Sequence, residues 1–507
     1  TKDNAGNLTI TTANSFTGPV VVNGGTLTVG NASALGTVAA GTTVAAGATL
    51  NLNGYTLSAG ETITLAGTGV AGSALTGAGA IQGDLVLTAD TTIGDPASTG
   101  SVNIGTSTVP RTITGAFTLT KTGTNKVWYR GPADGAGNSL LALVIDGGTF
   151  GIEANNNALN AVPITINAAG ILSSWGTGTA PTSQNNPITL NGGSLASNFP
   201  GQTYTGEITL TANSTLGTAA SPIGFTIAGV ISEGSGSFGL NKTQTGTVML
   251  TAENTYSGAT TVSAGMLQVG DGTQTTNLIP LTSGITLGVA EPATTGNITF
   301  RLNEDFAFGT PVTFASLASI FYLNMADPAK KMTVSDATSF AGTTNGIFQV
   351  SSGVLELAAG ADFKVKQVNL SNAVAANAVL SIADGASLTT KYINCGQGAS
   401  TAGTIVQTGG SVTLLGGDAE CYGLRLGHWG SGTQTSTYSL TGGVFDATGL
   451  SANDGVTMPR NITIGWDGGA RMIVGGGTGP ATAKVYGINW DGGGAGPASG
   501  TLHVFEN

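Results

Sequence analysis

One sequence motif, a strand and a turn that we call a phrase, occurs twice in this chain. Residues 14–32 read NSFTGPVVVNGGTLTVGNA and residues 254–272 read NTYSGATTVSAGMLQVGDG, with Asn, Gly, Val, Gly, Leu, Val and Gly at the same offsets. Both phrases alternate apolar and polar side chains on either side of a glycine turn, which is the pattern of short, half-buried β-strands. A chain that repeats such a phrase has to place many similar strands beside one another.

The same turn recurs from one end of the chain to the other. A small residue and a glycine come before an apolar strand residue at several places, and the turn glycines are Gly25, Gly148, Gly193, Gly265, Gly353, Gly410 and Gly443. Glycine reaches positive φ without steric cost, so each turn can redirect the chain and start a strand. Helical spacing is scarce. We therefore expect an all-β chain with little helix.

The chain also contains a longer repeat that includes several of these turns. Lys2, Lys121 and Lys242 stand about 120 residues apart, and each is followed after 23–27 residues by one of the glycine turns. The stretches around the last two, FTLTKTGTNKVW (117–128) and FGLNKTQTGTVM (238–249), are copies of one another. The chain is therefore expected to contain degenerate repeats of about 120 residues.

The sequence of the turns changes near residue 391. Lys364 stands where a fourth, degenerate copy should begin. Beyond it the turns read INCGQG, LGHWGSG, IGWDGG and INWDGG, and aligning them places at one position Cys395, His428, Trp466 and Trp490. We predict that 1–390 carries the 120-residue repeats and that 391–507 continues the same fold with this second repeat type.

The fold follows from what must cover the strand edges. An open sheet of this many strands would expose its edges and aggregate. A coil of strands that winds about one axis pairs each strand with the coils on either side and leaves edges only at its two ends. We therefore predict a parallel β-helix of roughly 20 or more coils, at about 22 residues per coil. The alternative is a string of antiparallel sandwiches, which the lack of long polar linkers disfavours.

Composition excludes several partners and classes. Only 8% of the residues are charged, the net charge is −11 and there are 16 Lys and Arg, so a phosphate backbone would be repelled. No run of about 20 apolar residues is present, so we expect no transmembrane segment. Positive mean hydropathy and low charge exclude a disordered chain. The chain opens with Thr1, and we expect it to be a processed or excised product.

The sequence does not signal an active site. Its two histidines, His428 and His503, are far apart and match no triad or zinc pattern, so we expect no catalytic residue, no metal and no cofactor. Cys395 and Cys421 are left open between a disulfide and two free thiols. Asp-Gly pairs are interpreted as turns rather than calcium sites. Surface Trp and Tyr could stack on sugar rings, although packing is the commoner use.

Residues 229–270 resemble the autotransporter-associated β-strand repeat of large bacterial surface proteins. The motif runs through a Lys-Thr strand, an Asn-Thr-Tyr turn and two glycine-led strands, and it is matched by Lys242, Asn254, Tyr256, Gly258, Val262, Gly265 and Leu267. Looser copies begin at Lys2 and Lys121. The resemblance implies a right-handed parallel β-helix on the bacterial cell surface, and it brings no catalytic residue.

The two ends of the chain suggest how such a subunit could assemble. Writing the last residues, FEN, before the first, TK, restores the phenylalanine that stands four positions before Lys121 and Lys242. We therefore hypothesise head-to-tail self-stacking through a junction of Thr1, Lys2, Leu8, Ile10, Leu502, Val504 and Phe505.

These observations predict an extracellular structural protein that is not an enzyme. Its head-to-tail stacking would build a surface filament, sheath or layer, so its main partner would be a second copy of itself. One alternative is a monomeric adhesin-like or carbohydrate-binding passenger rod whose partners are cell-surface glycans. Another is a polysaccharide lyase or hydrolase.

Overall fold

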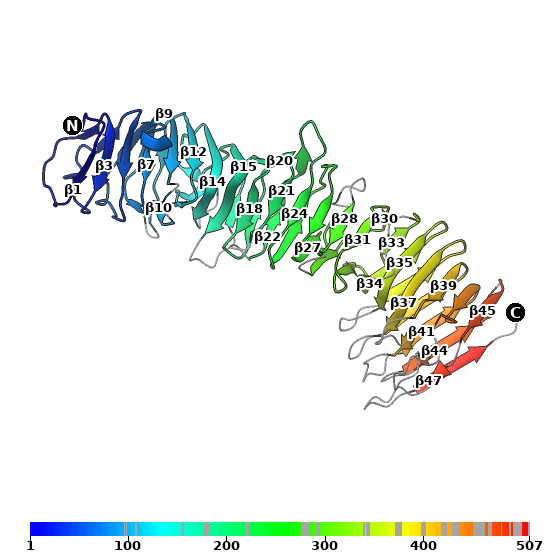
Figure 1. The fold of residues 1–507 in the computed structure, drawn as a ribbon. Coiled ribbons are helices and arrows are strands. Elements are labelled where there is room, and N and C mark those ends of the chain that lie inside the picture. The colour runs from blue at the N-terminus through cyan, green and yellow to red at the C-terminus, as the bar shows by residue number, and fades with distance from the viewer. Residues whose placement is uncertain are drawn as a thin grey trace. The chain divides into compact units, whose positions relative to one another are not determined.

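A computed structural model gives an all-β chain wound as a parallel β-solenoid (Figure 1). It divides into two compact units, residues 1–248 with 254–257, and residues 249–253 with 258–507. The structure describes residues 1–507 except 96, 98, 107–108, 154–156, 176–181, 219–222, 275–278, 280–283, 290–294, 338–339, 341–344, 371–377, 397–401, 417–422, 428–434, 450–461, 465–468, 478, 486–487, 490–498 and 505–507.

Strands of successive coils pair side by side in each unit. In the first unit, β1 (Asn7–Ile10) pairs with β3 (Gly25–Val29), and β3 pairs with β5 (Ala48–Asn51), in parallel and in register. In the second unit, β34 (Ile347–Leu357), β36 (Ala378–Ile382) and β38 (Gly403–Gln407) stack in the same way. Every strand ladder recorded among the described residues is parallel, so the sandwich alternative is wrong and the predicted fold class is confirmed.

The coil count is lower than predicted. The described residues make about 14 turns, against the expected 20 or more. The estimate assumed a uniform coil of about 22 residues. In the structure the interval between stacked partners grows from 20 residues between Ile188 and Ile208 to 38 between Gly443 and Ala481, because the coils of the second unit carry longer connections.

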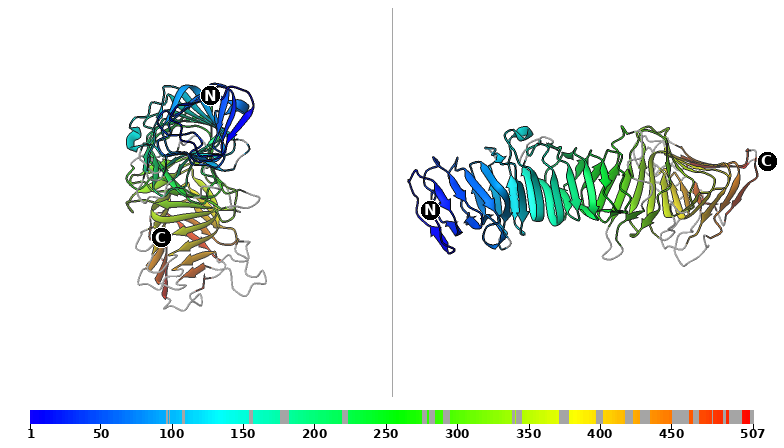
Figure 2. Two further views of the ribbon diagram at one scale, coloured as in Figure 1. Left: turned by 90° about the vertical axis from the view of Figure 1, so that its left-hand side faces the viewer. Right: turned by 90° about the horizontal axis from the view of Figure 1, so that it is seen from above.

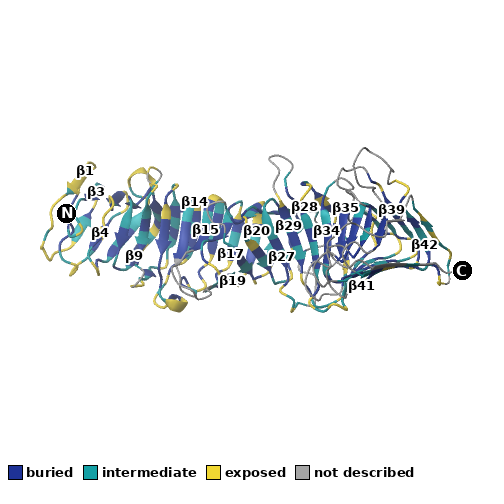
Figure 3. Ribbon diagram, turned by 90° about the horizontal axis from the view of Figure 1, so that it is seen from below, coloured by how far each residue is buried: buried dark blue, intermediate teal, exposed yellow. Residues whose placement is uncertain are grey.

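Alternation along each strand builds the core. In β36, Ala378, Leu380 and Ile382 are buried and the two residues between them are not, and the same two-residue period is visible across the sheets in Figure 3. Identical side chains fall into columns: Leu8, Leu27 and Leu50 are register partners in three consecutive coils of the first unit. The right-hand view of Figure 2 shows the strands of the first coils, in dark blue, next to one another.

Phenylalanines form a stacked column in the second unit. The ring of Phe321 lies 5.1 Å from that of Phe300 and 4.9 Å from that of Phe348, with interplanar angles of 11° and 13°. Phe308 and Phe340 pack edge-on against this column, and their rings are tilted by 32° relative to one another. Coil spacing near 4.8 Å places like residues at the distance that offset aromatic stacking prefers.

The turn glycines stand where the backbone requires them. Six of the seven have φ between 61° and 93°, namely Gly25, Gly148, Gly265, Gly353, Gly410 and Gly443. At the Gly193 turn the positive φ belongs to the preceding residue, Gly192. Space matters as well as φ, because a Cβ on Gly148 would lie 2.5 Å from the carbonyl oxygen of Asn125 in the neighbouring coil.

The second repeat type has a register that differs from the sequence alignment. Cys395 pairs with Leu426, and Leu426 pairs with Ile464. The sequence alignment of Cys395 with His428 is therefore wrong by two residues. Cys395 is stacked with the aliphatic residues Leu426 and Ile464, and the turn residues come after them. His428, Trp466 and Trp490 lie outside the described residues.

The cost of a side chain at a turn glycine can be separated from the cost of positive φ. We predict that Gly148→Ala lowers the free energy of unfolding by about 3 kcal/mol, since it adds a backbone clash to the φ penalty. Gly47 has φ 83° and open space around a Cβ, so Gly47→Ala should cost only about 1–2 kcal/mol. Urea unfolding of both variants checks this, and equal losses would contradict it.

Candidate functional site at the open first coil

Buried lysines close the turns of the first unit. Lys121, in β12 (Thr118–Thr122), donates from Nζ to the carbonyl oxygens of Thr122 at 2.6 Å, Gly123 at 3.0 Å and Gly147 at 2.9 Å. Thr122 and Gly123 lie on the lysine's own coil and Gly147 lies on the next one. One ammonium therefore ties two consecutive coils together.

The other two repeat lysines make related contacts. Lys2 donates to the carbonyl oxygen of Gly24 at 2.7 Å and to that of Asn4. Lys242, at the end of β24 (Leu240–Lys242), donates to the carbonyl oxygen of Gln244. The spacing of lysine and glycine turn in the sequence thus reflects one coil of chain, since the acceptor on the next coil must return to the Nζ.

Burial decides the electrostatics of these lysines. Lys121 and Lys242 are 0% and 1% exposed, and desolvation lowers the pKa of each to about 8. A buried ammonium is costly unless its donors are satisfied. The backbone carbonyl oxygens supply that satisfaction here.

Lys364 does not continue the series. It lies between the buried side chains of Phe363 and Val365, so the two-residue period turns it outward, where it pairs with Asp362. The fourth copy expected at this position therefore lacks a buried lysine.

The first coil presents an open edge. β1 pairs with β3, and no other described strand pairs with β1. Leu8 is 44% exposed, whereas Val127 and Val248, which follow Lys121 and Lys242 at the same offset, are 0% exposed. No described strand covers Leu8 on the side away from β3, which accounts for its exposure.

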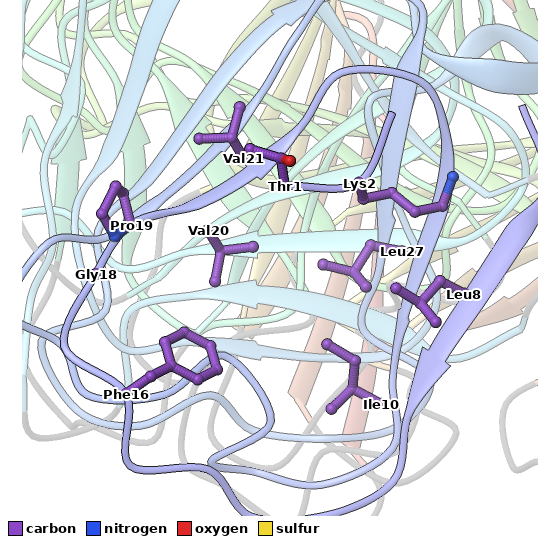
Figure 4. A pocket seen from close by; sticks show the side chains of 10 residues that line it. All are labelled: Thr1, Lys2, Leu8, Ile10, Phe16, Gly18, Pro19, Val20, Val21 and Leu27. Atoms are coloured by element: carbon purple, nitrogen blue, oxygen red, sulfur yellow. The ribbon is translucent and has the colours of Figure 1, made fainter. Parts of the chain in front are cut away.

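A hollow lies inside this edge. Its volume is about 330 Å³, and apolar side chains dominate its wall, including Leu8, Ile10, Phe16, Val20 and Leu27. Figure 4 shows Leu8, Ile10 and Leu27 on one side of the hollow and Val20 and Phe16 on the other. A more polar hollow of about 360 Å³ adjoins it at residues 1–8. The structure thus gathers Thr1, Lys2, Leu8 and Ile10, the four N-terminal residues of the predicted junction.

The C-terminal half of the predicted junction lies on β47 (Ser499–Val504). This strand pairs with β44 (Gly469–Val474) along its whole length, which places Leu502 opposite Met472 and Val504 opposite Val474. No described strand pairs with the other edge of β47. Phe505 lies outside the described residues, so its part in the junction stays a prediction.

Reactive groups are few at the described positions. Cys395 is buried, and burial raises the pKa of its thiol to about 12. Cys421 lies outside the described residues, so a disulfide between the two stays a prediction. The described residues contain no cluster of three His, Cys, Asp or Glu side chains suited to a metal ion. Within the same ranges we find no helix of the length and hydrophobicity needed to span a membrane.

Removing a buried lysine should destabilise the first unit. We predict that Lys121→Met lowers the free energy of unfolding by about 1–3 kcal/mol, because three carbonyl oxygens lose their donor. Lys364→Met, at a half-exposed ion pair, should change it by less than about 0.5 kcal/mol. Urea unfolding of the two variants makes the comparison, and an equal loss in both would count against the role of Lys121.

The lowered pKa values predict a pH dependence. The unfolded lysine titrates near 10.5 and the folded one near 8, so the unfolded chain binds the proton more tightly. Stability should therefore rise with pH from about 8 toward 9.5, by on the order of 1–2 kcal/mol per lysine. The double variant Lys121→Met/Lys242→Met should lose that rise. A flat profile in the parent protein would disprove the assignment.

Comparisons with known proteins match the same copies. The passenger-associated-transport-repeat family matches residues 1–29 and 240–269, which contain Lys2 and Lys242. The adhesin BmaC autotransporter of Brucella suis biovar 1 (strain 1330) is 27% identical over 325 residues, which is 61% of this chain and 8% of that protein. The chain therefore spans less than a tenth of the length of that relative.

No solved structure matches the chain. The repeat match and the adhesin relative agree with the resemblance seen in the sequence and extend it to more than half of the chain. Two segments of the chain match the passenger-associated transport repeat and the chain is similar to an autotransporter adhesin, which indicates a secreted, cell-surface protein.

Proposed function

We propose that the chain is a non-enzymatic, adhesin-like segment of a surface passenger. The observation that carries this is the similarity to an autotransporter adhesin over 61% of the chain, with the transport repeat at Lys2 and Lys242. The relative is far longer, so the chain would act as one stretch of an extended surface protein.

The use of the polar groups supports a structural role. The buried lysines bond to backbone carbonyl oxygens, and Lys331 pairs with Glu356 at 2.9 Å on the outer side of the coil. A polysaccharide lyase or hydrolase would need carboxylates gathered with a base or a second acid in one groove. Lys330 with Glu304 and Lys331 with Glu356 form ion pairs between neighbouring coils, which favours the passenger rod over that alternative.

An adhesion assay tests the proposal. Beads coated with residues 1–507 should bind to host-cell monolayers or glycan arrays above beads coated with an unrelated β-solenoid, and the chain should release no sugar from polysaccharides. Binding equal to that of the control beads would contradict the adhesin-like role. Release of unsaturated or reducing sugars would contradict the non-enzymatic one.

A second candidate function is head-to-tail stacking into a filament, sheath or layer. The open edge at Leu8 and Ile10 supports it, together with β47, whose outer edge no described strand covers. In a parallel solenoid the first edge of one copy has the donors and acceptors that the last edge of another requires. Such a heterologous contact propagates rather than closing.

Charged substitutions at the edge test the stacking. We predict that Leu8→Asp leaves a folded monomer that forms fewer ordered polymers at high protein concentration, because the carboxylate would enter the apolar contact. Leu317→Asp changes a side chain that is 59% exposed but does not lie at that edge, and it should polymerise like the parent. Negative-stain microscopy and sedimentation measure both. Deleting residues 502–507 should also stop assembly, and unchanged polymers in these variants would overturn the junction.

A further inference from the structure

One outer face of the first unit carries two parallel rows of polar side chains. The sheet beneath them contains β14 (Ala142–Glu153), β15 (Ile164–Trp175), β17 (Ile188–Asn191) and β20 (Ile208–Ala212), which pair in parallel and lie next to one another in Figure 3. Isoleucines and leucines of these strands are buried in the core, so the residues between them point outward. We call the outward rows the polar face.

The first row of the polar face is a column of hydroxyl groups. Thr165 pairs in register with Thr189, and Thr189 pairs with Thr209. Ser232, on β23 (Ile231–Glu233), is the register partner of Thr209. A hydroxyl donates one hydrogen bond and accepts two, so the row offers one such group on each of four consecutive coils.

The second row is a chain of hydrogen-bonded side chains. Thr211 donates from Oγ1 to Oδ1 of Asn191 at 3.2 Å. Asn191 donates from Nδ2 to Oδ1 of Asn167 at 2.8 Å, and Asn167 donates from Nδ2 to Oδ1 of Asp146 at 2.6 Å. Since every bond runs in the same direction along the row, each amide is held in one orientation.

These bonds use only part of what the two amides can offer. A carboxamide has two N–H donors and two acceptor positions on its oxygen. Asn167 and Asn191 each use one N–H and one acceptor position within the row, so each keeps one of both for a ligand. Thr165 and Thr189 lie two residues before them on the same strands. A donor, an acceptor and a hydroxyl therefore recur from coil to coil.

Charge and side-chain type decide which class of ligand fits. Residues 131–241 contain no lysine or arginine and five aspartates and glutamates, among them the exposed Asp146 and Glu207. An anionic ligand would be repelled. The two rows also lack an aromatic or arginine anchor, which most protein–protein interfaces use at their centre. An uncharged polyol is the class that matches a face of amides and hydroxyls.

We infer that the polar face binds a linear, uncharged, β-linked polysaccharide that lies along the two rows. Consecutive coils are about 4.8 Å apart, and the sugar units of an extended β-1,4-linked chain repeat at a similar distance. One sugar therefore meets each coil, where its hydroxyls accept from the amide N–H and donate to the amide or threonine oxygen. The amides are already ordered by their bonds to one another, so binding costs little side-chain entropy.

Oligosaccharide length tests this inference, which rests on the adhesin-like role proposed above and names the glycan. Frontal affinity chromatography over immobilised residues 1–507 is run with β-1,4-linked oligomers of glucose and of N-acetylglucosamine, of increasing length. We expect the affinity for one of the two series to rise with each added sugar and to level off near the length of the rows, four coils. Absence of binding by both series, or an affinity that does not depend on length, would overturn the inference.

Matched variants locate the site. Thr189→Val with Asn191→Leu removes a hydroxyl and an amide from the middle of the rows and should weaken binding of the longest oligomer by about tenfold. Thr203→Val with Thr226→Val changes an outward-facing register pair on another sheet of the same unit and should leave binding unchanged. If the first variant does not fold, as judged by urea unfolding, Thr209→Val alone should weaken binding by about threefold. Equal binding by the parent and the polar-face variant would exclude this face.

The inference and the proposed function can fail separately. If coated beads adhere to host cells but neither oligomer series binds, the adhesin-like role stands and the polar face is rejected. If the oligomers bind with the expected length dependence but the beads adhere to no cell, the adhesin-like role is rejected and the polar face remains a glycan site.

Discussion

Backbone hydrogen bonding between consecutive coils is the constraint on which the structure depends. Each short strand has two edges, and both must be covered by neighbours that run in the same direction. Coiling satisfies this requirement for every strand except those at the ends. It also explains the composition, because stacked coils select side chains that repeat well in columns, such as the leucines at positions 8, 27 and 50 and the phenylalanines at 300, 321 and 348.

The buried lysines turn this general scheme into a specific one. A chain with so few charges places Lys121 where no water reaches it and bonds it to carbonyl oxygens of two coils. Glycines at positions 94 and 217 make room for the turns that result. Each repeat of about 120 residues therefore contains a buried lysine, the turn that its ammonium closes and the strand that packs against that turn.

Much of the fold could be predicted from the sequence because it depends on local pattern. Two-residue alternation and glycine turns predict strands, and the need to cover edges predicts the coil. The coil count was wrong because connection lengths carry no periodic signal, as the long interval between Gly443 and Ala481 shows. The sequence alignment of Cys395 with His428 was wrong because it matched the residues of the turn motifs, whereas the strand register follows the buried residues before each turn. Leu8 stays a predicted junction residue. The need for glycine at position 94 could not be predicted from the sequence, because it depends on the distance to the carbonyl oxygen of Thr122 in the next coil.

Register is the central claim, and a cross-link measures it directly. Thr165 and Thr189 face outward on β15 (Ile164–Trp175) and β17 (Ile188–Asn191) and are parallel register partners in consecutive coils. We predict that cysteines at these two positions form an intrachain disulfide, detected by mass spectrometry of the oxidised protein. Cysteines in place of Thr165 and Leu190 should form no disulfide, because Leu190 is one residue out of register with Thr165 and faces inward. Cross-linking of the second pair in preference to the first would contradict the parallel coil described here.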